Sequence, residues 1–415
     1  MRLHSLVLPF RVNEYVLSEL IDWSRVPGDP MYQLVFPQPG MIDAGDEKEL
    51  ARLSQSRADA GELAALIARI RRAMNPHPSG QRELNVPTLD GVRLPGIQHK
   101  YRETLLYFPV HGQSCHAYCT YCFRWAQFIG DPDLRFAAPG PDWLVTYLRS
   151  HAEVSDVLIT GGDPMIMSTA RLDEHVRPLL SVSSVRTIRI GTKSLAYWPQ
   201  RFSTDADADD LLRLFEDVVR SGRTLAVMAH FSHPREIDTD LARRGLSRIL
   251  SAGAVVYCQA PLIGHVNDDP AVWSDLWRKE LAAGAVPYYL FIARDTGPYE
   301  YFRVSLDRAG RIFTEAYRDL PGLARTVRGP VMSVTAGKVV VDGVEETSQG
   351  RFFQLRMLQA RTPNLVGRPF RAHYSADAAW IDDLTLHPDT PPDLVAAIHG
   401  VPGTDESWTG RGFVS

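Results

Sequence analysis

The chain has 415 residues, of which 45% are hydrophobic and 23% are charged, a composition typical of a globular protein with a large core. The formal net charge of −4 gives no positive field that would attract nucleic acid or an anionic membrane. No apolar run reaches the length of a membrane span, and the N-terminus lacks the features of a secretory signal. Four cysteines in this length do not indicate a disulfide framework. We therefore expect a cytoplasmic protein without nucleic-acid or membrane partners.

Residues 1–98 are predicted to form an N-terminal helical region. Its strongest helical pattern covers 46–74 and ends where Pro and Gly interrupt it in the stretch NPHPSG. The basic residues of the whole chain are nearly all arginine. Chemistry that requires an amine therefore has five candidates, Lys48, Lys100, Lys193, Lys279 and Lys338.

From residue 104 onward, apolar runs typical of β-strands alternate with amphipathic helical patterns. The strand-like runs cover residues 104–110, 156–160, 185–191, 224–231, 254–263 and 287–293. The helical patterns lie near residues 141–151, 171–181, 207–221, 238–252, 270–284 and 305–318. Six consecutive strand–helix units predict a parallel sheet with right-handed crossovers, either a partial barrel or a doubly wound sheet.

Polar motifs at the ends of the six strands favour the barrel. The motifs HGQSC, TGGD, GTKS, HFSHP, CQAP and RD follow strands one to six. Active sites of α/β folds lie at the carboxyl ends of strands, so six such ends at one mouth predict an α/β fold with a partial (β/α)6 TIM-like barrel over residues 99–320. The extension over 321–415 is predicted to close the barrel. It should contain a hairpin at 334–347 that turns at Asp342–Gly343, followed by a Pro- and Arg-rich tail.

Three cysteines lie close together after the first strand. The stretch GQSCHAYCTYCFRW (112–125) contains Cys115, Cys119 and Cys122 in a C-x3-C-x2-C pattern. A structural zinc site takes four ligands, which His111 and His116 could complete, whereas Cys258 lies on a different strand. A [4Fe-4S] cluster is usually held by four thiolates, so three cysteines would leave one iron with a free coordination position.

The cysteine pattern at the end of a first strand resembles that of the radical S-adenosylmethionine (SAM) enzymes. The resemblance implies that the three cysteines hold a [4Fe-4S] cluster, that its free iron binds SAM, and that Tyr121 packs near the adenine. It also implies that the TGGD motif, with Gly161, Gly162 and Asp163, binds the amino group of SAM. The alternative for Asp163 is a helix N-cap in a tight strand–helix turn.

Longer stretches resemble the lysine 2,3-aminomutase family. They are MNPHPSGQ (74–81), GIQHKYRETLLYF (96–108), RIGTKSLAYWPQR (189–201), HFSHPREI (230–237), PLIGHVND (261–268) and the segment 287–303. The resemblance implies that Arg124 clamps the substrate α-carboxylate, as the fork of a guanidinium suits, and that Asp295 meets a distal amine. It also implies that Lys193, His230 and Gln259 face the SAM pocket. The alternatives are a surface ion pair for Arg124, a helix cap for Asp295 and satisfied polar core positions for the other three.

The same comparison predicts that the half of the site that would bind pyridoxal phosphate (PLP) is lost. Family members carry the PLP lysine in a Gly-rich loop just before a Pro-Val-Met, but here the stretch is LARTVRGPVMS, with Arg328 in that region. Arginine stays protonated and forms no Schiff base. Thr104 stands where the family has a phosphate-binding arginine, for which Arg102 could substitute. Lys338 is a poor replacement for the missing lysine, and Lys100 is a candidate phosphate ligand.

The sequence therefore predicts a radical SAM enzyme that abstracts hydrogen from an amino-acid-like substrate carrying a carboxylate, without PLP. One alternative is a PLP-dependent aminomutase with a relocated lysine. Another is a non-catalytic iron–sulfur or zinc-binding protein. The resemblance also implies a reductant such as flavodoxin or ferredoxin, and self-association into a homo-oligomer.

Overall fold

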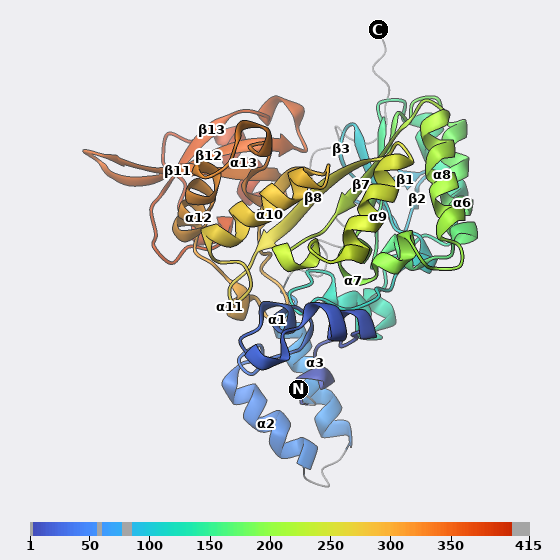
Figure 1. The fold of residues 1–415 in the computed structure, drawn as a ribbon. Coiled ribbons are helices and arrows are strands. Elements are labelled where there is room, and N and C mark those ends of the chain that lie inside the picture. The colour runs from blue at the N-terminus through green and yellow to red at the C-terminus, as the bar shows by residue number, and fades with distance from the viewer. Residues whose placement is uncertain (1–2, 56–59, 77–84, 401–415) are drawn as a thin grey trace.

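The computed structural model describes residues 3–55, 60–76 and 85–400 (Figure 1). Its centre is an 11-stranded sheet in the order β13-β12-β11-β10-β9-β8-β7-β6-β5-β4-β3. The strands of this sheet are β3 (Ile97–Tyr101), β4 (Thr104–Tyr107), β5 (Asp156–Ile159), β6 (Thr187–Thr192), β7 (Thr224–Ala229), β8 (Val255–Leu262), β9 (Val286–Ile292), β10 (Arg328–Val334), β11 (Gly337–Thr347), β12 (Gly350–Ala360) and β13 (Pro369–His373). A separate two-stranded sheet pairs β1 (Thr88–Leu89) with β2 (Val92–Arg93).

Strands β4 to β9 are parallel and neighbour one another in chain order, which confirms the six predicted strands. The helices that connect or follow them are α5 (Asp142–Ser150), α6 (Thr169–Val176), α7 (Ser194–Tyr197), α8 (Ala208–Arg220), α9 (Asp240–Ser251), α10 (Pro270–Ala282), α11 (Tyr299–Phe302) and α12 (Leu306–Arg318). Side-chain caps begin several of them; the Thr239 hydroxyl, for example, accepts from the backbone N–H of Ala242.

The two faces of the parallel sheet differ in burial. Along β4, β5, β6 and β8, fully buried residues alternate with residues that keep partial exposure. The buried set faces the helices, as the interaction between Cys258 on β8 and Glu280 on α10 shows. The partly exposed set, which includes Asp156, Arg189 and Gln259, therefore lines the opposite, inner face. Figure 1 shows α6, α8, α9 and α10 on the outside of the sheet.

The sheet curls until its β3 edge meets the β10–β11 turn. The Lys100 amine on β3 donates to the carbonyl oxygens of Val334 and Gly337, and the Lys338 amine on β11 lies 4.6 Å from the centre of the Tyr101 ring. Side chains rather than a strand ladder make this seam, because β3 pairs only with β4. The predicted partial TIM-like barrel is confirmed, with its wall completed by side chains.

The N-terminal region packs at one end of the barrel (Figure 1). Its α-helices are α1 (Pro30–Val35), α2 (Ala44–Gln55) and α3 (Ala60–Ala73). The predicted helix over 46–74 is thus two helices, and residues 56–59 between them lie outside the described residues. So do residues 77–84, which include most of the NPHPSG stretch. The carbonyl oxygen of Met74, just after α3, accepts from the backbone N–H of Gly297 at 2.8 Å, which ties this region to the loop after β9.

The C-terminal extension differs from its prediction in one detail. A hairpin is present, but β10 and β11 turn at residues 335–336, and β11 and β12 turn at 348–349. Asp342 and Gly343 lie inside β11, at a register shift where Gly343 has a φ of +148°. The Asp-Gly pair therefore forms a β-bulge and not a turn. Glycine suits both structures because it adopts positive φ angles without steric strain. The predicted tail contains β12, β13 and α13 (Pro392–His399).

Candidate functional site

The three cysteines of the motif lie in the loop between η4 (Val110–Gly112) and η5 (Trp125–Phe128), at the carboxyl end of β4. All three thiols are free and half-buried. Burial raises the pKa of Cys115 well above its ordinary value, and the charges of Asp163, Cys122 and Cys119 add to this effect. Burial likewise raises the pKa of Cys122 to about 12. Three thiols that influence one another in this way suit a cationic ligand, which would stabilise them as thiolates.

The N-terminal segment holds the cysteine loop from outside. Arg11 donates through Nη1 to the Ser114 hydroxyl at 2.7 Å and to the Cys115 carbonyl oxygen at 3.0 Å. The backbone N–H of Thr120 donates to the carbonyl oxygen of Leu34 at 2.9 Å. Residues 86 and 103 positions earlier in the chain therefore fix the conformation of the loop.

The Gly-Gly-Asp turn after β5 packs directly on the residues that precede Cys115. The backbone N–H of Asp163 donates to the Ser114 carbonyl oxygen at 2.7 Å. A Cβ atom on Gly162 would lie 2.5 Å from that same oxygen, and one on Gly161 would lie 2.3 Å from Nε2 of Gln113. In this structure the two glycines permit the close approach of the turn to the cysteine loop. Their contact with SAM stays a prediction.

The Asp163 carboxylate is 3% exposed and accepts four hydrogen bonds from the chain. The donors are the Thr192 hydroxyl at 2.7 Å, the backbone N–H groups of Met165 and Lys193 at 2.9 Å each, and the Ser194 hydroxyl at 3.0 Å. Asp163 therefore caps η7 (Pro164–Ile166) and joins the ends of β5 and β6. These contacts match the helix-cap alternative for Asp163. Its predicted role with the SAM ammonium group stays a prediction.

A second polar group lies beside Tyr121. The Tyr121 hydroxyl lies 3.0 Å from Nε2 of His230 and 2.9 Å from the hydroxyl of Ser232. Lys193 forms an ion pair with Glu236, with Nζ 2.7 Å from Oε1, and donates to the His230 carbonyl oxygen at 3.2 Å. The structure thus brings together three predicted cofactor-pocket residues from the ends of β4, β6 and β7.

Glu236 is the residue of this group that the sequence analysis missed. Its side chain is fully buried, and its carboxylate also accepts from the backbone N–H groups of Ser232 and His233. The stretch HFSHPRE signals the cap of a short helix, and η10 (Pro234–Glu236) does begin there. Nothing in the local pattern shows that the carboxylate also pairs with a lysine from another strand.

Burial sets the protonation state of His230. Burial first, and then the charge of Lys193, lowers the pKa of His230 well below its ordinary value. The imidazole is therefore neutral at pH 7, and its Nε2 can accept a hydrogen bond from the Tyr121 hydroxyl. Gln259, the other predicted residue of the pocket, lies on the inner face of β8 and is paired in register with Tyr289.

Arg124 and Asp295 lie on two loops that are locked together. Trp125 donates through Nε1 to the Thr296 hydroxyl at 3.1 Å, and its ring packs against Gly297, which has a φ of +67°. A Cβ atom on Gly297 would lie 3.1 Å from this ring. This contact holds both Arg124, which precedes Trp125, and Asp295, which precedes Thr296, at the mouth of the barrel.

The guanidinium of Arg124 lies over the Phe108 ring, 4.2 Å from its centre. Burial lowers the pKa of Arg124 to about 10, although the group remains charged at pH 7. Within residues 3–55, 60–76 and 85–400, no acidic side chain forms an ion pair with it. This geometry is compatible with the predicted carboxylate clamp, which requires a guanidinium not already occupied by the chain.

The residues predicted to bear on PLP lie deeper in the barrel. Arg328 packs on two tyrosines, with Cζ 4.2 Å from the Tyr288 ring centre and 4.3 Å from that of Tyr289. Lys100 donates to the backbone carbonyls of the seam, as described above, and Thr104 donates to Asp156 at 3.2 Å. The Lys338 amine donates to the side-chain amide oxygen of Gln359.

The zinc alternative finds no preformed site. Across the described stretches of the chain, no three His, Cys, Asp or Glu side chains are grouped so as to hold a single metal ion. The His116 ring stacks on Trp198 at 5.6 Å, and the His111 ring lies 6.2 Å from that of His175. Cluster ligands bind separate irons, so a three-thiolate [4Fe-4S] site does not require such convergence.

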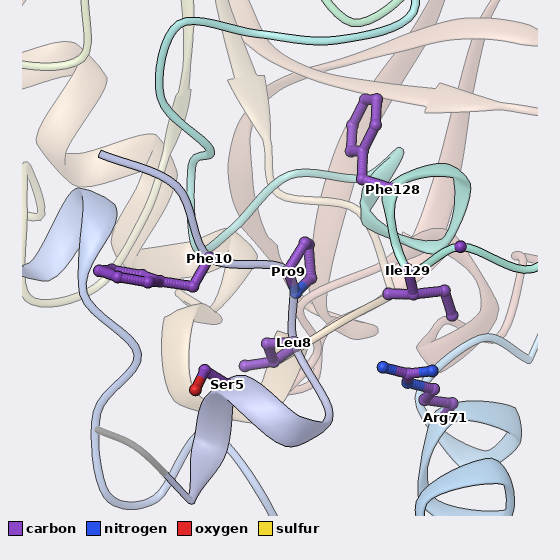
Figure 2. A pocket seen from close by; sticks show the side chains of 8 residues that line it. Ser5, Leu8, Pro9, Phe10, Arg71, Phe128 and Ile129 are labelled. Carbon is purple, nitrogen blue, oxygen red and sulfur yellow. The ribbon is translucent and has the colours of Figure 1, made fainter. Parts of the chain in front are cut away.

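A surface pocket of about 500 Å³ lies outside the barrel, beside the loop that follows the cysteines (Figure 2). It is lined by Ser5, Leu8, Pro9, Phe10, Arg71, Phe128, Ile129 and Gly130. Its one cation, Arg71, already donates to the carbonyl oxygens of Leu6 and Val7 at 2.9 Å each. Apart from that guanidinium, the lining offers no group suited to acid–base or metal chemistry, so the pocket is not the candidate active site.

The sequence of the chain is similar to those of known 2,3-aminomutases. A putative L-lysine 2,3-aminomutase from Aquifex aeolicus is 29% identical over 384 residues, which cover 91% of this chain and 87% of that protein. A second protein of that description from the same organism is 33% identical over 52% of this chain and 55% of its own length. The glutamate 2,3-aminomutase of Clostridioides difficile is 28% identical over 47% of this chain and 43% of its own. The chain thus spans most of the first relative and about half of the other two.

The remaining comparisons add little. No family model matches the chain. A radical SAM methyltransferase from Sphaerobacter thermophilus has a TM-score of 0.37 at 15% identity, over 57% of this chain and 68% of that chain, which is too low to support an argument. Among the described residues, no helix has both the length and the apolar character needed to cross a membrane.

Proposed function

We propose that this chain is a radical SAM enzyme similar to the lysine 2,3-aminomutases, and that it abstracts hydrogen from an amino-acid-like substrate that carries a carboxylate, without PLP. The observation that supports the proposal best is the docking of the Gly-Gly-Asp turn on the three-cysteine loop. Hydrogen bonds from Asp163 to Gly112 and Ser114 make these two motifs one rigid unit at the mouth of the barrel.

Cys115, Cys119 and Cys122 would hold a [4Fe-4S] cluster, and the donor set of three free thiols fits such a group. When bound, the cluster and SAM supply a 5′-deoxyadenosyl radical that abstracts hydrogen. The chain's own residues orient and shield this chemistry. Tyr121 is fixed by His230 and Ser232, and Lys193 by Glu236, so neither side chain must be ordered when a cofactor binds.

Arg124 would bind the substrate carboxylate through two parallel N–H donors. The N-terminal region covers the mouth of the barrel and hydrogen-bonds to both the cysteine loop and the loop after β9. Such a cover limits the access of water to an unselective radical. A reductant such as flavodoxin or ferredoxin would supply the electron.

Anaerobic reconstitution with iron, sulfide and SAM tests the proposal. We expect the chain to take up a [4Fe-4S] cluster whose electron paramagnetic resonance spectrum changes on adding SAM. Under dithionite, 5′-deoxyadenosine should form, and a panel of deuterated amino acids should reveal the attacked carbon by deuterium transfer. Cys119→Ser should abolish the cluster, whereas Cys258→Ser, at the buried thiol behind β8, should retain it. A chain that binds only zinc, or a cluster that ignores SAM, would contradict the proposal.

One observation favours a second candidate function, that of a PLP-dependent aminomutase with a relocated lysine. Burial lowers the pKa of Lys338 to about 7, and the charges of Arg189 and Arg328 contribute. A partly neutral amine at pH 7 is capable of imine formation. PLP bound as an imine would give a visible absorbance band that borohydride removes and that Lys338→Met lacks. A spectrum unchanged by PLP would rule this function out.

A further inference from the structure

The inner face of the barrel carries an unbalanced group of cations below the cysteine loop. We call Arg189 on β6, Arg328 on β10 and Lys338 on β11 the basal cations. Arg328 and Lys338 lie on the two arms of the β10–β11 hairpin, and Arg189 comes from a strand much earlier in the chain. Arg328 is paired in register with Tyr289 of β9, and Arg189 lies on the partly exposed inner face of β6.

Aromatic rings bring two of these cations together. The ring centre of Tyr289 lies 4.3 Å from Cζ of Arg328 and 5.5 Å from Nζ of Lys338. The Tyr288 ring centre lies 4.2 Å from the same Cζ of Arg328, and the Tyr288 ring packs edge-on against Tyr289. A positive charge on an aromatic face is attracted by the ring, but this contact does not neutralise it.

One of the basal cations is paired with a carboxylate, and the other two are not. Arg189 forms a two-point ion pair with Asp156, with contacts of 2.7 and 2.8 Å. Among the described residues, neither Arg328 nor Lys338 forms an ion pair with a carboxylate. The Lys338 amine donates to a neutral amide, and the buried Tyr289 hydroxyl has no well-formed hydrogen bond to a described residue, although the Tyr288 hydroxyl lies near enough to affect its pKa. Half-buried cationic groups without a carboxylate partner are costly, so such a site favours an anionic ligand.

The basal cations lie at a depth that a small ligand can span. Arg189 precedes Thr192 by three residues on β6, and Thr192 holds Asp163 at the mouth. At roughly 3.3 Å per residue, the cations are about 10 Å below the mouth. An amino-acid-sized substrate held at Arg124 by one end would therefore direct its other end toward them.

We propose that Arg328 and Lys338, with the Asp156-paired Arg189 beside them, bind a second anionic group of the substrate, a carboxylate or a phosphate, at the end opposite the α-carboxylate. This inference rests on the proposed function and narrows its substrate class. A distal ammonium group, such as that of lysine, would meet like charges at this place, whereas a second anion would complete the unpaired cations.

Binding of small charged probes to the anaerobically reconstituted full chain tests the inference. Isothermal titration calorimetry would compare glutarate, inorganic phosphate and 1,5-diaminopentane, of which the first and last have five carbons and opposite charge. We expect an anion to bind and the diamine not to bind. Arg328→Gln should weaken anion binding about tenfold or more, the loss of one charged hydrogen-bonded contact. Arg356→Gln, which removes an exposed pair with Asp342 on the same sheet, should leave it unchanged.

Binding of glutarate would indicate a dicarboxylate substrate. Selective binding of phosphate would indicate a phosphorylated ligand, and the absorbance test with PLP described above distinguishes PLP from a phosphorylated substrate. Equal binding by the wild type and Arg328→Gln, or preference for the diamine, would overturn the inference. A measurement on the unaltered chain covers the case in which Arg328→Gln does not fold. Acetylation of Lys338, mapped by mass spectrometry, should slow when the anion is present, whereas that of the half-exposed Lys279 on α10 should not.

The spectrum of the cluster with SAM, recorded in the same samples, distinguishes the two proposals. Loss of anion binding with an intact spectral response to SAM would leave the proposed function standing. Anion binding without such a response would contradict the proposed function and retain the anion site. Unchanged Lys338 acetylation in the presence of either anion would overturn the site itself.

Discussion

The mouth and the base of the barrel differ in whether their charged side chains have partners of opposite charge or hydrogen-bond donors. At the mouth, Asp163 receives four hydrogen bonds and Lys193 is paired with a fully buried Glu236. At the base, Arg328 and Lys338 rest on tyrosine rings without a carboxylate partner among the described residues. The side chains at the mouth are therefore ordered before any ligand binds, whereas the base has positive charge that an anionic ligand can neutralise. Substitutions at the mouth should cost stability, and those at the base should cost binding.

Glu236→Gln should have the largest effect on stability. The glutamine would place an amide nitrogen against the Lys193 ammonium, and a buried charge would lose its partner. We expect the free energy of unfolding to fall by about 3 kcal/mol, measured by chemical denaturation. Glu174→Gln, at an exposed pair with Arg171, should change it by less than about 0.5 kcal/mol. Equal losses of unfolding free energy in Glu236→Gln and Glu174→Gln would show that the buried ion pair at the mouth stabilises the fold no more than an exposed one.

Gly162→Ala should come next. Its Cβ atom would clash with backbone atoms of Ser114, which cannot move without displacing the cysteine loop. We expect a loss of about 2 kcal/mol in unfolding free energy and reduced iron uptake on reconstitution. Gly310→Ala, at an open position in α12, should be neutral or slightly stabilising. Full cluster assembly in Gly162→Ala would show that the two motifs do not act as one unit.

The pH dependence of stability should reveal Lys338. Its neighbours are Arg189, Arg328, Lys100 and Asp156, and its pKa is about 7 in the folded chain against an ordinary 10.5. Between these values the unfolded chain binds the extra proton, so stability rises with pH, by up to about 1.4 kcal/mol per pH unit.

Lys338→Met should remove that slope between pH 7 and 10, as measured by the difference in unfolding free energy from wild type. Lys279→Met provides the control, because nearby carboxylates, Asp238 first among them, hold the pKa of Lys279 above its ordinary value. If the difference in unfolding free energy between wild type and Lys338→Met did not change with pH, the pKa of Lys338 would not be lowered in the folded chain.

Asp295→Asn should have the smallest effect, and this effect concerns ligand binding, because the residue lies at the mouth of the barrel rather than among the basal cations. Removing the carboxylate should strengthen glutarate binding at the base slightly, since one negative charge is lost from the mouth of the barrel. Weaker glutarate binding would instead place Asp295 in direct support of the anion site.

Much of the fold could be predicted from local patterns. The six parallel strands and their helices follow from apolar runs and amphipathic periods, since each element has one face against the core. The hairpin turn was placed wrongly because Asp342–Gly343 has the composition of a turn but occupies a bulge inside β11. Local composition cannot distinguish these two uses of a flexible residue.

The candidate site was predictable where the chemistry lies in one short motif. The cysteine loop, the Gly-Gly-Asp turn and the group of Tyr121, Lys193 and His230 lie together at the mouth. Glu236 was missed because its partner comes from another strand. The basal cations were not predicted as a group because Lys338 reaches them only when β11 turns back beside β10. Pairings of this kind depend on topology, which short patterns do not contain.

The side-chain seam between β3 and the β10–β11 turn has a mechanical consequence. Every other joint in the wall is a ladder of backbone hydrogen bonds, which breaks only cooperatively, whereas Lys100 and Tyr101 can let go one contact at a time. In the part of the chain that the structure describes, this seam is thus the line of the barrel wall that can open without breaking a strand ladder. Deuterium exchange should be fastest along that line.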